Sequence, residues 1–261
     1  MFSETDYDKL QQIMEESPEK AELLTRLLDS HQMTISTISH EIRNPLTLVY
    51  STLQLISSQH PEVATFKYWD QLVQDVEYIK LLLEELSSYN NGSKLNPSLI
   101  DSDTFFKTVS LSFAAAIADT KIEFLSRIFS NLPDIVCDSV KIRQLLLNLL
   151  GNAKDAVLSG KSICPKISME VFPAGNLLSA KDENDTSQEY THIIIKISDN
   201  GCGISSEHIQ HIFDPFITYK SGGTGLGLAI AKRIAFAHRG TLTVSSSPES
   251  PTVFTLTLPV K

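Results

Sequence analysis

A histidine, a glutamate and a nearby proline stand together in the stretch "TISTISHEIRNPLTLVYSTLQLI", Thr34 to Ile56. A His-Glu pair can perform nucleophilic or acid–base chemistry, because imidazole titrates near neutral pH and a carboxylate can hold or remove its second proton. Apolar residues recur here at steps of three and four, which is typical of an amphipathic helix. At about 100° per residue, His40 points away from the apolar seam, and Asn44 lies one turn later on the same exposed face.

Pro45 lies in the interior of this predicted helix. Its ring removes the amide that would bond the carbonyl of Glu41, which costs roughly 3 kcal/mol and bends or loosens the turn. An isolated exposed histidine is most simply a surface residue. A proline kept at that cost beside His40 and Glu41 instead favours a chemical role for the turn.

Polar side chains also gather on one face of a second predicted helix, Val140 to Leu158. Gln144, Asn148, Asn152 and Asp155 recur at spacings of four, four and three, opposite an apolar face. Amide oxygens on one helical face are good ligands for a hard cation, but they are equally explained as solvent-facing polar groups. The spacing alone leaves both roles open.

Two glycine-containing segments favour a nucleotide. "IIIKISDNGCGISSEHI" is an apolar strand that leads into Asp199, and Gly201 and Gly203 then permit a tight turn close to a ligand. A buried carboxylate there could accept a hydrogen bond from an exocyclic amine such as that of adenine. "KSGGTGLGLAIAKRIAFAHRG" is a glycine-rich loop entering a helix, where free amides favour phosphate. It is neither a Walker nor a Rossmann loop, since no Gly-Lys-Ser/Thr follows and no strand leads directly into it.

The elements that must position these groups begin with a helical hairpin. Ser17 can cap a helix with Pro18 in its first turn, and the pattern continues to Gln59, where "SSQHPE" breaks it. The apolar seam of this first arm is Ile35, Ile38, Ile42, Leu46, Val49, Leu53 and Ile56, and that of the second arm is Trp69, Leu72, Val76, Ile79, Leu83 and Leu86. Two arms cannot bury both seams alone, so we expect a dimeric four-helix bundle.

The rest of the chain mixes strands and helices. We expect a short strand, a helix from about Asp101, the helix over 140–158, and strands near 122–129, 135–137, 167–172, 192–198, 241–245 and 253–258. The predicted layout is one mixed sheet with helices packed on one face, and "LSAKDENDTSQEY" is expected to be a hairpin loop. The predicted fold class is therefore α+β, a helical hairpin followed by an α/β sandwich.

Composition excludes several classes of protein. A chain of 261 residues is long enough for two compact units, and its net charge of −9 argues against a general affinity for nucleic acid or anionic membrane. Three distant cysteines indicate neither a disulfide framework nor a zinc site, so a reducing, cytoplasmic location fits best. No apolar run approaches membrane-spanning length, which predicts no membrane segment in this chain.

Five motifs in order resemble those of two-component sensor histidine kinases. "SHEIRNPL" is similar to the phosphoacceptor box of that family, "RQLLLNLLGNAKDAV" to its asparagine box, "DNGCGI" to its first glycine box, "IFDPFITYK" to its phenylalanine box and "GGTGLGLAIAKRI" to its second glycine box. The close spacing of the last two boxes resembles the short-lid branch of nitrogen-regulatory and sporulation kinases. The resemblance covers nearly all of 20–261 and implies a lead-in at 1–20, a dimerisation and phosphotransfer hairpin at 21–92, and at 93–261 the ATP-binding fold shared by gyrase, Hsp90 and MutL proteins (the GHKL or Bergerat fold).

The resemblance also implies roles for individual residues. His40 attacks the γ-phosphate of ATP, Glu41 holds or deprotonates its other ring nitrogen, and Asn44 orients a water for dephosphorylation of a partner. The implied nucleotide-binding residues are Asn148, Asn152, Asp155, Asp199, Gly201, Gly203, Lys220, Gly223, Thr224, Gly225, Leu226 and Gly227. Asn152, helped by Asn148, would hold Mg²⁺. Asp155 departs from the lysine that related branches often carry, so Lys220 is the better cationic candidate for phosphate.

The implied partners are a second copy of the chain and the receiver domain of a response regulator, which would accept the phosphoryl group on an aspartate. The segment 1–20 is too short for a sensor domain, so we expect either a fragment or a separate sensory protein that supplies the signal. Two alternatives stay open. One is a phosphotransfer, docking or phosphatase-dominant module with little kinase activity, which intact asparagine and glycine boxes disfavour. The other is an ATPase clamp like gyrase or Hsp90, which the phosphoacceptor box disfavours.

Overall fold

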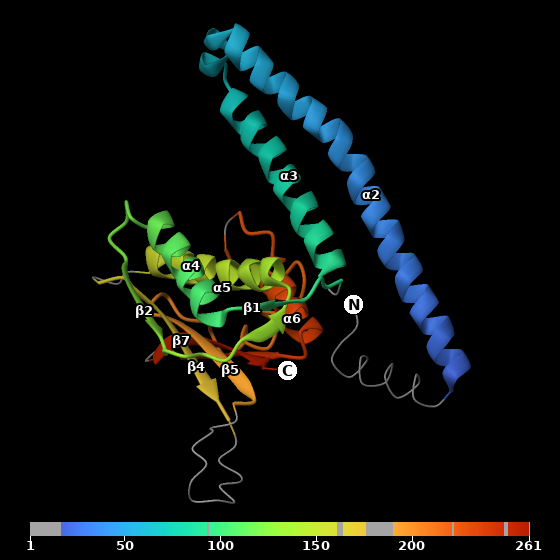
Figure 1. The fold of residues 1–261 in the computed structure, drawn as a ribbon. Coiled ribbons are helices and arrows are strands. Elements are labelled where there is room, and N and C mark those ends of the chain that lie inside the picture. Colours follow the sequence, from blue (N-terminus) through green and yellow to red (C-terminus); the bar gives the residue numbers. More distant parts are fainter. Residues whose placement is uncertain are drawn as a thin grey trace, which may run out of the picture. The chain divides into compact units, whose positions relative to one another are not determined.

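The computed structural model describes residues 17–92, 94–160, 164–175, 190–220, 222–247 and 250–260. The chain divides into two compact units, Met1–Asn91 and Gly92–Lys261, which are described separately below. Figure 1 labels their helices and strands. Within the described part of the chain, no helix is both long and apolar enough to cross a membrane.

The first unit is a helical hairpin. Helix α2 spans Pro18–Gln59, a short 3₁₀ helix η1 spans Pro61–Thr65, and helix α3 spans Trp69–Asn91. The predicted ends of the first arm are confirmed, because Pro18 stands in the first turn and the chain turns at His60, which precedes a proline. One detail of the prediction is wrong, since the side chain of Ser17 makes no capping hydrogen bond to α2.

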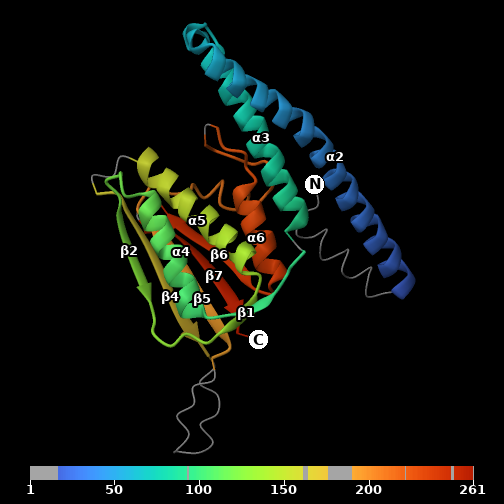
Figure 2. The same ribbon diagram turned by 45° about the horizontal axis from the view of Figure 1, so that its top comes forward.

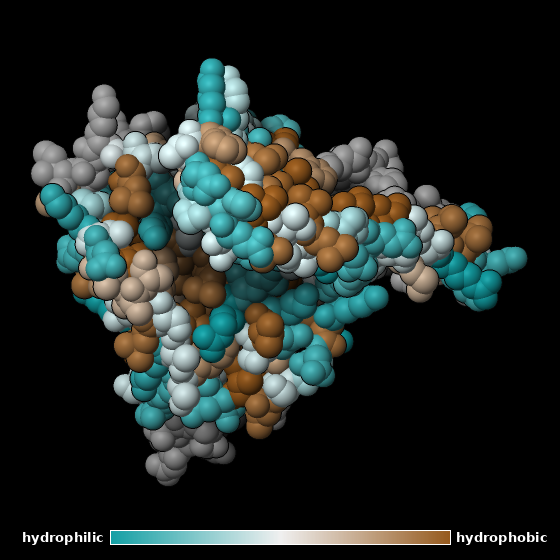
Figure 3. Space-filling model, turned by 90° about the horizontal axis from the view of Figure 1, so that it is seen from above, coloured by the Kyte–Doolittle hydropathy of each residue, from teal (hydrophilic) through white to brown (hydrophobic). Residues whose placement is uncertain are grey.

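The two helices bury only part of their apolar seams against each other. Leu53, Val76 and Leu83 are buried, and so is Val63 of η1. In contrast, five seam residues remain between 44% and 49% exposed: Ile38, Ile42, Val49, Leu72 and Ile79. Figure 3 shows apolar atoms gathered along the outside of the helical hairpin. The single chain therefore leaves an apolar strip of the kind that a second copy would cover.

The second unit follows the predicted order of elements. Its strands are β1 Ser98–Ile100, β2 Glu123–Ile128, β3 Ile135–Cys137, β4 Lys166–Ala174, β5 His192–Asp199, β6 Thr241–Ser247 and β7 Ser250–Pro259. Its helices are α4 Ser102–Ala116, α5 Ser139–Ser159 and α6 Gly227–Ala237. The carboxylates of Asp101 and Asp138 cap α4 and α5 by accepting backbone N–H bonds from their first turns, which explains where both helices begin.

The strands form two sheets, so the expectation of one mixed sheet is wrong in this respect. Five strands lie in the order β2-β4-β5-β7-β6, with β2 parallel to β4 and the other neighbours antiparallel. Among the described residues the short strands β1 and β3 pair with each other alone, in an antiparallel register that sets Leu99 against Val136. Three residues in each strand are too few to reveal their pairing partners from sequence alone.

The core lies between the larger sheet and its helices. Along β5 and β7 every second residue is buried, and Figure 2 shows α4, α5 and α6 on the same side of the sheet. The buried row of α5 supplies the other half of this core: Ile142, Leu145, Leu146, Leu149, Leu150, Ala153 and Val157. The expectation of helices on one face is therefore confirmed.

Two predicted features lie largely outside the described residues. These are the lead-in at 1–20, of which 17–20 is described, and the hairpin loop "LSAKDENDTSQEY" at 178–190. The strands on either side of that loop, β4 and β5, do pair in antiparallel fashion from Ile167↔Asp199 to Ala174↔His192.

Candidate active site

The histidine face of α2 is exposed. His40, Glu41 and Asn44 are all solvent-accessible, and Pro45 lies inside the helix, which continues through it to Gln59. The proline has no N–H to give to the Glu41 carbonyl, so one backbone hydrogen bond is missing in the turn that carries His40. The structure therefore places the three predicted side chains on an accessible part of the first unit.

Arg43 is a neighbour of His40 that the sequence analysis overlooked. One guanidinium nitrogen, Nη1, lies 3.3 Å from Nδ1 of His40, and the other, Nη2, donates to the carbonyl of Leu83 on α3 at 3.4 Å. Since a guanidinium can only donate, this contact makes Nδ1 the acceptor and leaves the proton of a neutral ring on Nε2. The i,i+3 spacing within "HEIR" was the available signal. The contact that we expected from Glu41 stays a prediction.

In the second unit, two polar side chains end the buried rows of neighbouring strands. The inward-facing residues of β5 are isoleucines until Asp199, and those of β7 are large apolar residues from Phe254 onward but begin with Thr252. Asp199 and Thr252 are paired directly across the two strands, and both are buried, at 3% and 4% exposure. Directly paired residues project to the same face of a sheet, so this pair forms a polar patch at the edge of the core.

Burial raises the pKa of Asp199 above its usual value. Two groups oppose the effect of burial: the backbone N–H of Gly201, which donates to Oδ1 at 2.9 Å, and the positive charge of Lys220. A desolvated carboxylate is costly for stability and is common at ligand sites. The position of Asp199 therefore suits an acceptor for an incoming N–H donor.

A lysine from the glycine-rich loop reaches the polar face of α5. The ammonium of Lys220 donates to Oδ1 of Asn152 at 2.8 Å and to Oδ2 of Asp155 at 3.1 Å. Asn148 instead donates its side-chain amide to the carbonyl of Gly227, at the start of α6, at 3.1 Å. The structure thus brings the side-chain oxygens of Asn152 and Asp155 together around the ammonium of Lys220. Because Asn148 uses its nitrogen for the bond to Gly227, its side-chain oxygen is the atom that can bind a metal ion.

Glycine is required by geometry at three of the predicted positions. A Cβ on Gly201 would lie 2.5 Å from the backbone of Ala156 in α5, and one on Gly225 would lie 2.6 Å from the backbone of Phe216. Gly203 and Gly225 have φ values of +72° and +71°, which other residues rarely adopt. Gly223 would place a Cβ 2.5 Å from the Thr218 hydroxyl, whereas Gly227 has more room.

The remaining predicted loop residues lie at the entrance to α6. The hydroxyl of Thr224 accepts the N–H of Leu226 at 3.3 Å, and Leu226 is fully buried as the residue before the helix. The free N–H groups of the first turn of α6 and the positive end of its dipole therefore follow directly after the glycine-rich loop.

The residues present fit a magnesium ion only when a nucleotide is also bound. Among the described residues there is no cluster of three or more His, Cys, Asp or Glu side chains that could hold a metal. Asn152 nevertheless already faces a cation, since its oxygen binds the Lys220 ammonium. Mg²⁺ is commonly held by one or two protein oxygens together with substrate phosphates, and two amide oxygens on α5 match that arrangement.

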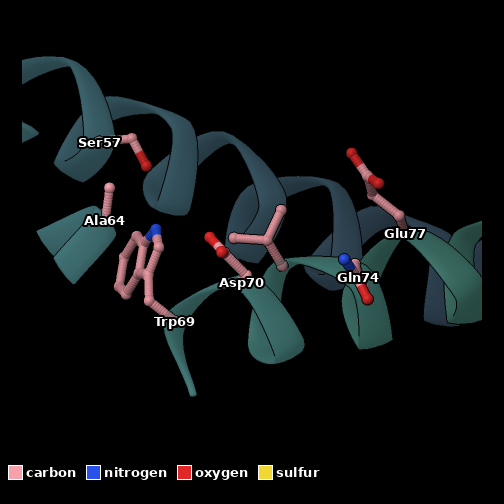
Figure 4. Close-up of a pocket in the computed structure, with 7 residues that line it drawn as sticks. Ser57, Ala64, Trp69, Asp70, Gln74 and Glu77 are labelled. Carbon is pink, nitrogen blue, oxygen red and sulfur yellow. The ribbon is translucent and has the colours of Figure 1, made fainter. Parts of the chain in front are cut away.

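A cavity of about 410 Å³ lies elsewhere, at the closed end of the hairpin. In Figure 4 the indole of Trp69 and the side chain of Asp70 project from α3 toward α2, near Ser57. Ala64, Val73, Gln74 and Glu77 complete the lining. Because neither His40 nor Asn44 contributes to it, we assign this cavity to the packing of the hairpin rather than to the chemistry.

Comparison with known proteins gives two family models and a series of relatives. Residues 30–92 match the His Kinase A (phospho-acceptor) domain, and residues 137–261 match the histidine kinase-, DNA gyrase B- and HSP90-like ATPase domain. The chain is 30% identical over 223 residues to the signal transduction histidine-protein kinase AtoS of Escherichia coli, which covers 85% of this chain and 34% of that protein. It is 28% identical to sporulation kinase B of Bacillus subtilis, covering 95% of this chain and 55% of that kinase.

Solved structures show the same fold. Full-length ShkA in complex with AMPPNP superimposes with a TM-score of 0.68 at 21% identity, over 87% of this chain and 45% of that one. The Acinetobacter baumannii histidine kinase AdeS gives a TM-score of 0.56 at 23% identity, over 85% and 98% of the two chains. The chain spans less than two thirds of the length of AtoS and sporulation kinase B. With both family models matched in order, the chain belongs to the two-component sensor histidine kinases and carries their transmitter core.

Proposed function

We propose that this chain is an ATP-dependent protein-histidine kinase that phosphorylates itself on His40. The observation that carries the proposal is the cluster in the second unit, where a loop lysine meets Asn152 and Asp155 and adds its charge to the field at the buried Asp199. Cationic, amide and carboxylate groups placed beside a glycine-rich loop suit the phosphates, metal and base of ATP. Relatives that share both domains are named histidine kinases.

Each group has a distinct task in this proposal. Asp199 accepts the exocyclic amine of adenine, and Gly201 and Gly203 allow the base to approach the backbone. The loop through Gly223, Gly225 and Gly227, with Thr224 and Leu226, presents amides to the phosphates at the start of α6. Asn152 and Asn148 hold Mg²⁺, which neutralises phosphate charge, and Lys220 exchanges its contacts on α5 for the phosphates.

On the first unit, His40 is the nucleophile. An imidazole nitrogen must carry a free lone pair to attack the γ-phosphate, and Glu41 accepts the ring proton that would otherwise leave a cation. Arg43 holds Nδ1 in the resting protein, so attack through Nε2 requires Arg43 to release Nδ1 and the ring proton to move from Nε2 to Nδ1, where Glu41 accepts it as ADP leaves. The phosphoryl group then passes to an aspartate in the receiver domain of a response regulator, and the active species is a homodimer.

A labelling experiment tests this function. Incubation with γ-labelled ATP and Mg²⁺ is expected to give a base-stable, acid-labile label on the protein. His40→Gln should abolish that label while ATP affinity stays within a few-fold of the parent, and His60→Gln, at an exposed histidine of the same hairpin, should keep it. Persistent acid-labile label in His40→Gln would remove His40 from its role. If the protein hydrolyses ATP but carries no label, the result favours an ATPase clamp. If it neither hydrolyses ATP nor carries a label, the result favours a docking module.

A second activity, dephosphorylation of the partner, is favoured by the position of Asn44. This exposed amide lies one turn from His40 on the same helical face, where the partner's phospho-aspartate must dock. An amide can orient a water for in-line attack. Asn44→Ala is expected to keep label at His40 but to lose the ability to dephosphorylate a phosphorylated regulator. If Asn44→Ala removes phosphate as fast as the parent does, this second activity does not depend on Asn44.

A further inference from the structure

The pairing of β6 with β7 is irregular next to the candidate base-binding end. It is regular as far as Ser245↔Val253 and resumes at Ser247↔Ser250, so Ser246 stands opposite two residues of β7. The extra residue of this β-bulge therefore belongs to β7, and bulges are common beside active sites. In β6 itself the alternation is regular, and Ser246 lies on the same face as the inward-facing Leu242 and Val244.

The hydroxyl of Ser246 connects two separate segments. Its oxygen accepts the backbone N–H of Ile204 at 3.0 Å, and it lies 2.9 Å from the hydroxyl oxygen of Thr252. Ile204 ends the turn that contains Gly201 and Gly203, and Thr252 is the residue paired with Asp199. A serine hydroxyl can accept one bond and donate its own proton to another group, so both contacts can form at once.

The direction of these bonds decides which groups face a ligand. When Ser246 accepts from Ile204 and donates to Thr252, the proton of the Thr252 hydroxyl is free to point elsewhere. Thr252 and Asp199 then offer a donor and an acceptor side by side, since directly paired residues have Cβ atoms roughly 5 Å apart. Adenine presents the complement, an amine beside a ring nitrogen that accepts. Hypoxanthine presents the reverse, a carbonyl oxygen beside a ring N–H.

We propose that Ser246 is a positioning residue of the nucleotide site, which fixes the glycine turn after Asp199 and sets the Thr252 hydroxyl as a donor, and thereby contributes to the selection of adenine. The inference rests on the proposed function, because it takes the ligand of the second unit to be ATP. Neither Ser246 nor Thr252 stands in a glycine-rich or asparagine motif, and their contacts with each other and with Ile204 join β6, β7 and the turn after β5.

The test compares ATP with ITP, which differs only at the base. Titration calorimetry on the full chain with Mg²⁺ is expected to show that the parent prefers ATP. In Ser246→Ala the loss of one hydrogen bond should weaken ATP binding by about fivefold, with less than a twofold change for ITP. Ser246→Thr keeps the hydroxyl and should restore the preference. Ser245→Ala removes an exposed serine from the neighbouring position and should leave both affinities unchanged.

The possible results distinguish a failure of the role proposed for Ser246 from a failure of the proposed function. If the parent chain binds no ATP, the proposed function fails. If the parent prefers ATP and Ser246→Ala keeps that preference, only the role of Ser246 is wrong. If Ser246→Ala lowers the affinities for ATP and ITP equally, Ser246 only supports the fold, and this result also contradicts the proposal. Should Ser246→Ala not fold, Thr252→Val keeps the bond from Ile204 to Ser246, and an undiminished preference for ATP in that variant would overturn the proposal.

Discussion

At the scale of single residues, Asp199 stands out because the fold does not need its charge. The carboxylate is 3% exposed, and burial raises its pKa against the opposing effects of the Gly201 N–H and Lys220. A group whose pKa is raised on folding stabilises the folded state at low pH and loses that contribution as the pH rises through the raised value. At neutral pH the ionised side chain of Asp199 therefore lowers the stability of the folded state. We infer that it serves to bind an N–H donor of a ligand.

Asp199→Asn is accordingly expected to gain stability and lose ligand affinity. The urea midpoint of the variant should exceed that of the parent at pH 7, and the difference should narrow as the pH falls toward 3.8, the ordinary pKa of the carboxyl. Loss of a charged hydrogen bond should weaken ATP binding about 10- to 100-fold. Asp119→Asn, at an exposed carboxylate, serves as the control. A variant that is less stable than the parent at every pH would show that the charge supports the fold.

The metal assignment predicts a contrast between two neighbours on α5. Asn152→Ala should weaken Mg-ATP binding about 10- to 100-fold, because a lost metal ligand also removes charge neutralisation at the phosphates. Asp155→Ala should change it by less than about threefold, since the exposed ion pair with Lys220 contributes little. Titrations with and without EDTA distinguish the causes. If the effect of Asn152→Ala persists without Mg²⁺, Asn152 contacts the nucleotide by another route.

At the scale of elements, a buried histidine joins the two helices of the nucleotide site. His238 follows α6, and its Nε2 accepts the backbone N–H of Asp138, just before α5, at 3.0 Å. Its Nδ1 donates to the carbonyl of Ile234 at 2.8 Å, so the ring bridges the helices as a neutral imidazole. The side chain of His238 is 8% exposed, as a bridge between packed helices requires.

His238→Ala should therefore destabilise the second unit. A buried N–H left without an acceptor costs about 1–3 kcal/mol, which urea denaturation can measure. His192→Ala, at an exposed histidine in β5, should stay within about 0.5 kcal/mol of the parent. Because α5 carries Asn152 and α6 follows the glycine-rich loop, ATP affinity should fall together with stability. Equal stabilities for the two variants would contradict the bridging role.

Local sequence patterns predicted the elements better than the contacts between them. The bounds of the first arm, the caps of α4 and α5 and the buried row of α5 all follow from periodicity and capping residues close in sequence. The pairing of β1 with β3, the bond from Ile204 to Ser246 and the bond from Asp138 to His238 depend on residues that lie tens of positions apart. No local pattern specifies such partners, and for that reason Thr252 and Ser246 were overlooked.

At the scale of the whole molecule, the hairpin is incomplete as a single chain. Val49 on α2 and Ile79 on α3 remain 48% and 44% exposed although both continue apolar seams. Burying such side chains stabilises by about 25 cal/mol for each Å² removed from water, and a symmetric dimer gains each contribution twice. The exposed strip therefore provides a driving force for the expected four-helix bundle.

A charge placed on this strip should separate the dimer without unfolding the nucleotide unit. In Val49→Glu or Ile79→Glu two carboxylates would enter the interface of a symmetric dimer, and the cost of burying them should weaken association at least 100-fold. Light scattering is expected to give the mass of two 28.9 kDa chains for the parent and of one for each variant.

Thr47→Glu provides the matched control, because it introduces the same charge at an exposed position of α2 that lies outside the seam. It should remain dimeric, and all three variants should bind ATP like the parent, since the second unit forms its own core between α5 and the sheet. If Val49→Glu and Ile79→Glu remain dimeric, the apolar strip is not the interface between copies. If they lose ATP binding as well, the two units depend on each other for folding, and the separate cores do not act independently.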